Sequence, residues 1–163
     1  MRPGLRRLAC WLAGAWAGLI AGIGFVAAPA LFATLPRGDA GRVAAQLFSV
    51  DATIGVCVGA VLLLLCLQLA RVDAADGMSS RFSTEMLLAL GAVFAIVAGH
   101  YAIQPMMESA RRGEGGASFA VLHGVSSAFF VLRFAAVSAL AWRLTGAPRR
   151  RDRDPATPAE PTS

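Results

Sequence analysis

One apolar stretch near the start of the sequence, residues 8–35, reads LACWLAGAWAGLIAGIGFVAAPALFATL and holds no charged side chain. A helix needs about 20 apolar residues to cross the hydrocarbon core of a bilayer. The stretch exceeds that length, and Pro29 is expected to end or kink the helix because proline cannot donate a backbone hydrogen bond. Three more apolar runs follow, and the pair Gln104–Pro105 ends the third. The sequence therefore predicts an all-α integral membrane bundle of four transmembrane helices, with spans at about residues 8–32, 47–70, 86–104 and 117–142.

The overall composition supports the same class of protein. Hydrophobic residues make up 56% of the chain and charged residues 15%, whereas about 25% of the residues in soluble domains are charged. All 15 basic residues are arginines, and they flank the apolar runs instead of gathering with aromatic residues on one face. This distribution argues against nucleic acid as a partner. The lipid bilayer is the expected partner.

The arginines outside the spans also predict an orientation. Ten lie in the N-terminal segment, the second connection and the C-terminal segment, and four lie in the first and third connections. Because arginine is enriched on the cytoplasmic side, both termini are expected in the cytoplasm. The chain then divides into a cytoplasmic segment (1–7), a transmembrane domain (8–143) and a proline-rich cytoplasmic tail (144–163) that is expected to be disordered.

A cleaved signal peptide is the alternative interpretation of the first run, since arginines precede it and Val26-Ala27-Ala28 resembles a small-residue cleavage site. Hydrophobic regions of such peptides are about 7–15 residues long. The run is longer than that and rich in glycine, which favours a retained span.

Small residues at steps of four predict the faces through which the helices pack. Gly14, Gly18 and Gly22 form the strongest such stripe, because residues four apart share a helix face and glycine lets another backbone approach closely. Further stripes comprise Gly55 and Gly59 in the second run and Gly91, Ala95 and Gly99 in the third. Packing within one bundle is the expected role, and a homo-oligomer contact through Gly14, Gly18 and Gly22 is the alternative.

Three ionisable residues inside the apolar runs are candidates for a functional site. In the predicted orientation Asp51, His100 and His123 all lie about 5–10 Å below the outer surface, counted from the span ends at about 1.5 Å per residue. Together they are suitable ligands for a divalent transition metal, and His100 and His123 alone could hold haem or copper. The trio could also relay protons. The structural alternative is that each histidine is hydrogen-bonded near a wet interface and that Asp51 is capped or paired locally.

Arg133 is the one arginine inside a predicted span. It lies seven residues after Ser126, so the two residues share nearly the same helix face, and Arg133 falls in the inner half of the membrane. We expect Arg133 to pair with Glu85 or Gln68, or to extend towards the cytoplasmic headgroups. A gating or substrate-binding role is the alternative.

Three segments carry a family resemblance. They are residues 25–32, FVAAPALF, residues 100–107, HYAIQPMM, and residues 119–127, FAVLHGVSS. They resemble bacterial members of the domain of unknown function 4149 family, which is related to transmembrane protein 205. The resemblance implies a small multi-helix protein of the bacterial inner membrane without an established activity. Its motif positions in this sequence are Pro29, Phe32, Gly41, Phe48, Pro105, His123, Gly124 and Ser126.

The sequence contains no phosphate-binding glycine loop, no H-E-x-x-H and no G-x-S-x-G. We therefore expect a non-enzymatic multi-pass membrane protein whose activity the sequence does not name. Two alternatives stay open: a haem or copper protein that uses His100 and His123, and a transporter of a small ion or solute that uses Asp51 and Arg133.

Overall fold

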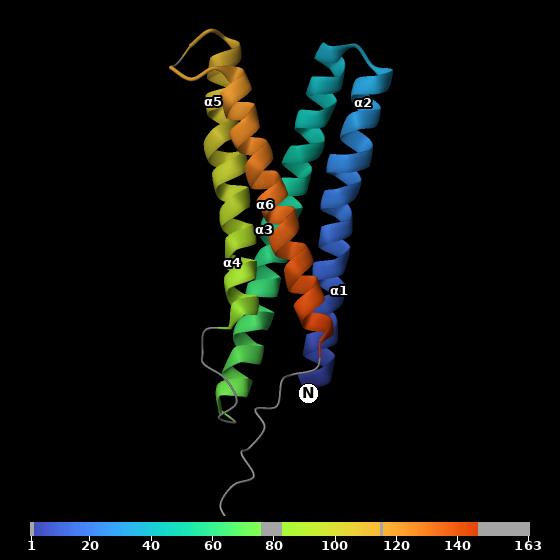
Figure 1. Ribbon diagram of the computed structural model, residues 1–163, viewed down its shortest axis with the longest axis vertical. Helices are drawn as coiled ribbons and strands as arrows, with labels where there is room; N and C mark the ends of the chain where they lie inside the picture. The colour runs from blue at the N-terminus through green and yellow to red at the C-terminus, as the bar shows by residue number, and fades with distance from the viewer. Residues whose placement is uncertain (1, 76–82, 115, 147–163) are drawn as a thin grey trace, which may run out of the picture.

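Four long helical rods make up the described part of the protein and run side by side along its length (Figure 1). The computed structural model describes residues 2–75, 83–114 and 116–146, and these ranges contain no strand. Two π-helical segments, η1 and η2, interrupt the first and third rods. The elements in chain order are α1 (Arg2–Ala21), η1 (Gly22–Ala27), α2 (Ala28–Thr34), α3 (Arg37–Ala75), α4 (Thr84–Ile96), η2 (Val97–Ala102), α5 (Ile103–Arg111) and α6 (Phe119–Thr145).

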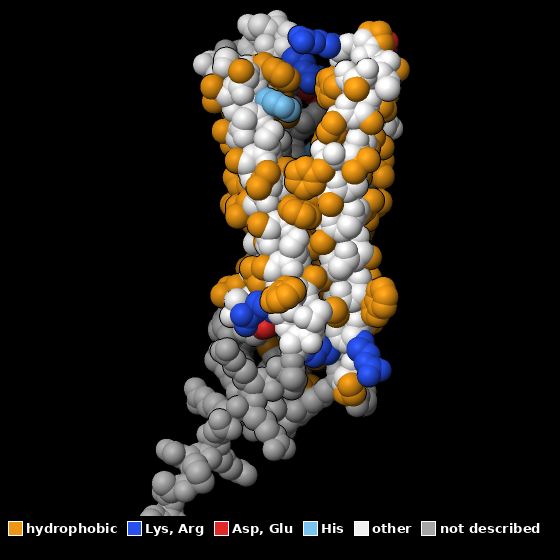
Figure 2. Space-filling view, turned by 45° about the vertical axis from the view of Figure 1, so that its right-hand side comes forward, with side chains coloured by type: hydrophobic (Ala, Val, Ile, Leu, Met, Phe, Trp, Pro, Cys, Tyr) orange, Lys and Arg blue, Asp and Glu red, His pale blue; other side chains and the backbone are white. Residues whose placement is uncertain are grey.

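Each rod is long and apolar enough to cross a membrane. The four candidate spans contain 32, 36, 28 and 27 residues, and about 20 are needed to cross the hydrocarbon core. On the face shown in Figure 2, the arginine side chains lie near the two ends of the molecule and hydrophobic side chains cover the length between them. This pattern confirms the predicted all-α membrane bundle with four spans.

Most helix ends lie beyond the ends of the predicted spans. The second rod begins at Arg37 instead of residue 47, because residues 37–46 continue the helix and Arg42 pairs with Asp39 on its surface. The first and third rods continue past their prolines to Thr34 and Arg111. Of the predicted disordered tail, residues 147–163 lie outside the described residues.

The π-helical segments explain why Pro29 and Pro105 do not end their helices. A proline ring clashes with the carbonyl group four residues earlier, which belongs to Phe25 in η1 or Tyr101 in η2. A π turn is wider than an α turn, so it moves that carbonyl away from the ring. The helix therefore passes the proline and keeps its general direction.

The rods form two helix hairpins, and both hairpins start at the same end of the bundle. The first hairpin comprises α1 to α3, and the second comprises α4 to α6. Around the bundle, α1 contacts α3, α3 contacts α4, α4 contacts α6, and α6 contacts α1. This order places α3 and α6 on one diagonal of the bundle and α1 and α4 on the other.

The two ends of the bundle differ in how the hairpins meet. We name them the terminal end, where α1 begins and α6 ends, and the turn end, where α2 connects to α3 and α5 to α6. The hairpins lie together near the terminal end and diverge towards the turn end (Figure 1). At the turn end α2 packs on α3, and α5 packs on α6, each within its own hairpin.

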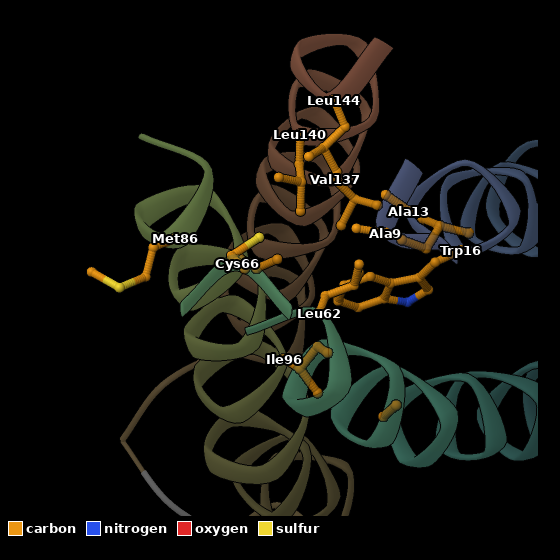
Figure 3. Packing of buried hydrophobic residues seen from close by; sticks show 14 residues of the cluster. Ala9, Ala13, Trp16, Leu62, Cys66, Met86, Ile96, Val137, Leu140 and Leu144 are labelled. Carbon is orange, nitrogen blue, oxygen red and sulfur yellow. The ribbon is translucent and has the colours of Figure 1, made fainter. Parts of the chain in front are cut away.

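The main hydrophobic core fills the terminal half of the bundle. Figure 3 shows how side chains from all four rods meet there. Trp16 reaches from α1 to α3, and Leu140 projects inward from α6. The fully or nearly buried members of this cluster include Ala9, Ala13, Trp16, Ile20, Leu62, Cys66, Ile96, Val137 and Leu140.

Only some of the glycine stripes pack within the bundle. A Cβ atom on Gly59 would lie 2.5 Å from Val93, and one on Gly99 would lie 2.7 Å from Phe129, so both glycines permit close helix contacts as predicted. The stripe expected to be the strongest does not pack: nothing lies within 4 Å of a Cβ on Gly14, Gly18 or Gly22, and the same is true of Gly91. Periodicity identifies residues on one face, but it does not tell which face points inward. An oligomer contact through Gly14, Gly18 and Gly22 stays a prediction.

Polar contacts at the terminal end join the two hairpins through Arg6, and join α4 to α6 within the second hairpin through Arg143. Arg6 of α1 donates to the carbonyl oxygens of Arg143, Leu144 and Gly146 at distances of 2.6–3.1 Å. These carbonyls lie at the end of α6, where the helix leaves carbonyl oxygens without their usual partners, so a cation there binds them and opposes the negative end of the helix dipole. Arg143 in turn forms an ion pair with Glu85 of α4, at 3.0 Å between Nε and Oε1.

Candidate functional site

A buried ion pair lies at the centre of the bundle. Arg133 Nη2 of α6 donates to Asp51 Oδ2 of α3. Asp51 is 1% exposed and Arg133 is 4% exposed, and in the described part of the chain no other charged residue is buried. Since α3 and α6 are diagonal partners, the pair crosses the middle of the bundle. An ionisable pair at this place is costly unless fully compensated, so it is the first candidate for function.

The structure corrects the predicted partners of Arg133. Glu85 pairs with Arg143 instead, and the Arg133 guanidinium stays in the bundle centre instead of extending to the cytoplasmic headgroups. The prediction was wrong because α3 begins earlier than its apolar run. Asp51 and Arg133 each lie fourteen residues from the turn-end start of their helix, which is a depth of about 21 Å.

The hydrogen bonding of the pair is incomplete. Asp51 Oδ1 and Arg133 Nε are buried, yet neither has a hydrogen-bond partner among the described residues. The indole nitrogen of Trp16, Nε1, is also buried and has no hydrogen-bond partner among the described residues. It lies 3.3 Å from the position of a Cβ on Gly55, one helical turn from Asp51. A buried polar atom without a partner costs about 1–3 kcal/mol, so one acceptor and two donors here have bonding capacity that the protein leaves unused.

Aromatic rings line the site on its turn-end side. The Phe130 ring lies 5.2 Å from the guanidinium carbon of Arg133, within the range of a cation–π contact. Phe48 meets Phe130 edge-on across the diagonal, with ring centroids 5.4 Å apart, and Phe25 of η1 meets Phe134 in the same way. The arginine therefore has an apolar wall beside it, and these rings separate the ion pair from the turn end.

The two hairpins repeat one plan around this pair. In each, a π-helical segment is followed within three residues by a proline, a turn reverses the chain, and the returning helix carries Phe-x-x-charge. The charged residues of the two repeats are the partners Asp51 and Arg133, and their phenylalanines, Phe48 and Phe130, touch. The ion pair thus lies on an approximate two-fold axis that runs along the bundle. This repeat was not predicted from the sequence, although the Phe-x-x-charge spacing is common to the two halves of the chain.

His100 lies in η2 near the ion pair. The ring is half-buried and meets Tyr101 edge-on, with centroids 5.1 Å apart. It lies within electrostatic range of both Arg133 and Asp51. The neighbouring Gly99 carbonyl accepts a hydrogen bond from Ser126 Oγ at 3.0 Å, which joins η2 to α6.

His123 lies nearer the turn end and is exposed. Its ring stacks on Phe119, with centroids 5.8 Å apart and planes 10° apart, and the Arg111 guanidinium covers the same Phe119 ring. Seven residues, about two turns, separate His123 from Phe130, so both share one face of α6. That face is half-buried at Phe130 and exposed at His123, because the hairpins diverge between these two levels. Figure 2 shows the surface hollowed between the hairpins near the turn end.

The predicted three-residue metal site of Asp51, His100 and His123 is not assembled. Among the described residues no three His, Cys, Asp or Glu side chains come close enough to hold a metal ion, and Asp51 is engaged by Arg133. The common depth was also wrong. His123 lies about 6 Å from the turn end of its helix and His100 about 17 Å from the turn end of its rod, whereas Asp51 lies at about 21 Å. Haem or copper held by His100 and His123 alone stays a prediction.

Comparison with known proteins gives a family but no activity. No curated protein matches the chain, and no solved structure matches it. A family described as "Domain of unknown function" matches residues 11–115. The motif positions from Pro29 to Pro105 fall inside this match, and His123, Gly124 and Ser126 fall outside it. The match covers more than half of the chain, so the protein belongs to the DUF4149 family.

Proposed function

We propose that the protein transports a small polar solute across the membrane without enzymatic chemistry, and that the Asp51–Arg133 pair is its binding site. The observation that carries this proposal is the buried ion pair with unused hydrogen-bonding atoms on both partners. A pair kept only for stability gains little over apolar packing of the same volume. Charged residues facing the interior of a membrane bundle commonly mark a substrate path.

The surroundings of the pair suit a carrier that is open on one side. The hairpins diverge on the turn-end side, and the surface is hollowed between them near that end (Figure 2). On the terminal side the packed core and the Arg6 contacts close the bundle. Parallel repeats about an axis along the membrane normal, with a site at their interface, are a recurring plan of transporters. Interrupted helices such as those at η1 and η2 are also frequent at functional sites.

The arginine distribution supports an orientation of the protein in the membrane. We place the terminal end in the cytoplasm and the turn end outside the inner membrane of a bacterium, because arginine predominates in the segments that reach the terminal end. The hollow between the hairpins is then open to the outside.

Flux measurements on proteoliposomes test the proposal. The panel comprises potassium chloride, ammonium acetate and urea, each followed as uptake into vesicles with and without protein. The control is the double variant Asp51→Leu with Arg133→Leu, which keeps the core apolar and removes both polar partners. We expect at least one solute to enter through the unmodified protein and not through the double variant. Equal flux through both proteins, or no flux above empty vesicles, contradicts the proposal.

A haem or copper protein remains the alternative because both histidines lie in the turn-end half. An absorption spectrum of the purified protein distinguishes the two functions, since a stoichiometric Soret band would favour the cofactor protein.

A further inference from the structure

The ion pair and its neighbours also limit the chemistry of the solute. We infer that the ligand of this site is a small molecule without net charge that carries a hydrogen-bond donor next to an acceptor, as in the urea and amide class. This inference rests on the proposed function and adds the class of substrate. It follows from the charge balance of the site, from the atoms left without partners, and from the walls around them.

The charge balance excludes an ion as the resting ligand. Asp51 and Arg133 carry opposite charges and neutralise each other in the bundle centre. An added anion or cation would leave one uncompensated charge among apolar helices, which is unfavourable where little water can solvate it. A ligand without net charge leaves the pair intact.

The atoms without partners specify the groups that such a ligand needs. Asp51 Oδ1 is an acceptor and requires a donor on the ligand, whereas Arg133 Nε and Trp16 Nε1 are donors and require an acceptor. A carbonyl oxygen beside an N–H or O–H group meets all three requirements. Trp16 packs against Gly55 and Gly59, so it forms the terminal-side floor of the site and places its N–H one turn from the carboxylate.

The walls limit the size of the ligand. The rings of Phe48 and Phe130 lie on the turn-end side of the pair, and a Cβ on Gly24 would already lie 2.5 Å from Phe130. Apolar walls with a few converging polar groups are typical of small-molecule sites. Because the atoms without partners are themselves buried, the ligand must be compact, with only a few heavy atoms.

Trp16→Phe is the variant that tests the inference, because it removes the indole N–H and keeps an aromatic ring in the core. The matched control is Trp11→Phe on the same helix, where the side chain is 79% exposed on the outside of the bundle. Urea entry into proteoliposomes is followed by stopped-flow light scattering, and chloride and potassium entry by indicator dyes. We expect urea to enter and both ions to be excluded. Trp16→Phe should lower urea permeability about fivefold, as expected for one lost hydrogen bond, and Trp11→Phe should leave it unchanged.

The outcomes separate this inference from the proposed function. If ions enter in a way that depends on Asp51 and Arg133 and urea is excluded, the ligand is not uncharged. That outcome contradicts this inference and supports the proposed transport function. Equal urea permeability in the two tryptophan variants overturns the role of Trp16. If neither urea nor any ion enters, both proposals fall. Should Trp16→Phe fail to fold, the comparison of urea with the two ions in the unmodified protein still decides the charge of the ligand.

Discussion

The two halves of the bundle, divided at the level of the Asp51–Arg133 pair, are held together by different means. In the terminal half all four rods share one core, Arg6 joins the two hairpins, and the Arg143–Glu85 pair joins α6 to α4 within the second hairpin. In the turn half the second hairpin has its own small cluster, Ile103, Met107 and Leu122, and α2 packs mainly within the first hairpin. The core that all four rods share therefore lies in the terminal half, and near the ion pair the hairpins still touch through Phe48–Phe130 and Phe25–Phe134.

The difference between the halves suggests how the molecule could change state. Interfaces with few shared contacts open at low cost, whereas a shared core opens only with global unfolding. The π-helical segments lie on the turn-end side of the pair, in the first and third rods, where each helix is already interrupted. The turn half is thus the part in which the hairpins can move relative to each other while the terminal half stays closed.

The largest expected difference between the halves is access to water. Ser127 and Ser138 lie eleven residues apart, about three turns, on one face of α6 and on opposite sides of Arg133. In a background without Cys10, Cys57 and Cys66, a membrane-impermeant thiol reagent added to intact cells should label Ser127→Cys and leave Ser138→Cys unlabelled. Labelling of neither cysteine would contradict the water-filled hollow, and labelling of Ser138→Cys alone would reverse the proposed orientation.

The second prediction concerns the ion pair at the boundary. Asp51→Leu or Arg133→Leu alone should lower the free energy of unfolding by about 3–5 kcal/mol, because each leaves an uncompensated buried charge. The double variant should recover most of this loss. Arg143→Leu, which breaks the partly exposed pair with Glu85, should cost about 1 kcal/mol or less. Denaturant titration of the detergent-solubilised protein measures all four, and equal losses for the buried and the surface pair would refute the distinction.

A smaller effect is expected from substituting Gly59 and Gly14, which both belong to glycine stripes at steps of four in the sequence. Gly59→Leu introduces a side chain where Val93 and Trp16 already lie within 3.3 Å of the Cβ position, and overpacking of this kind costs about 1–3 kcal/mol. Gly14→Leu projects into open space and should leave the free energy of unfolding of the monomer unchanged. Denaturant titration of the detergent-solubilised protein compares the Gly59→Leu and Gly14→Leu variants. A loss of stability with Gly14→Leu that depends on protein concentration would instead reveal an oligomer contact at the α1 stripe.

The candidate site could be predicted only in part from the sequence. Asp51, His100, His123 and Arg133 stood out because each is ionisable and lies within an apolar run. Their pairing could not be read from the sequence, because the depth of Asp51 was counted from the start of the apolar run and not from the start of the helix at Arg37. Trp16 was not a candidate at all, since an indole in a membrane helix is ordinary until its N–H is found without a partner.

The number of helices, their membrane location and the family resemblance were determined by the sequence alone. Hydrophobicity is a local property, and a run of about 20 apolar residues has few other stable conformations in a bilayer. The inward face of each helix, the passage of the helices through Pro29 and Pro105, and the Asp51–Arg133 pair were decided by the tertiary structure. Each of these depends on which helix lies opposite at a given depth, and side-chain periodicity within one helix carries no information about its neighbour.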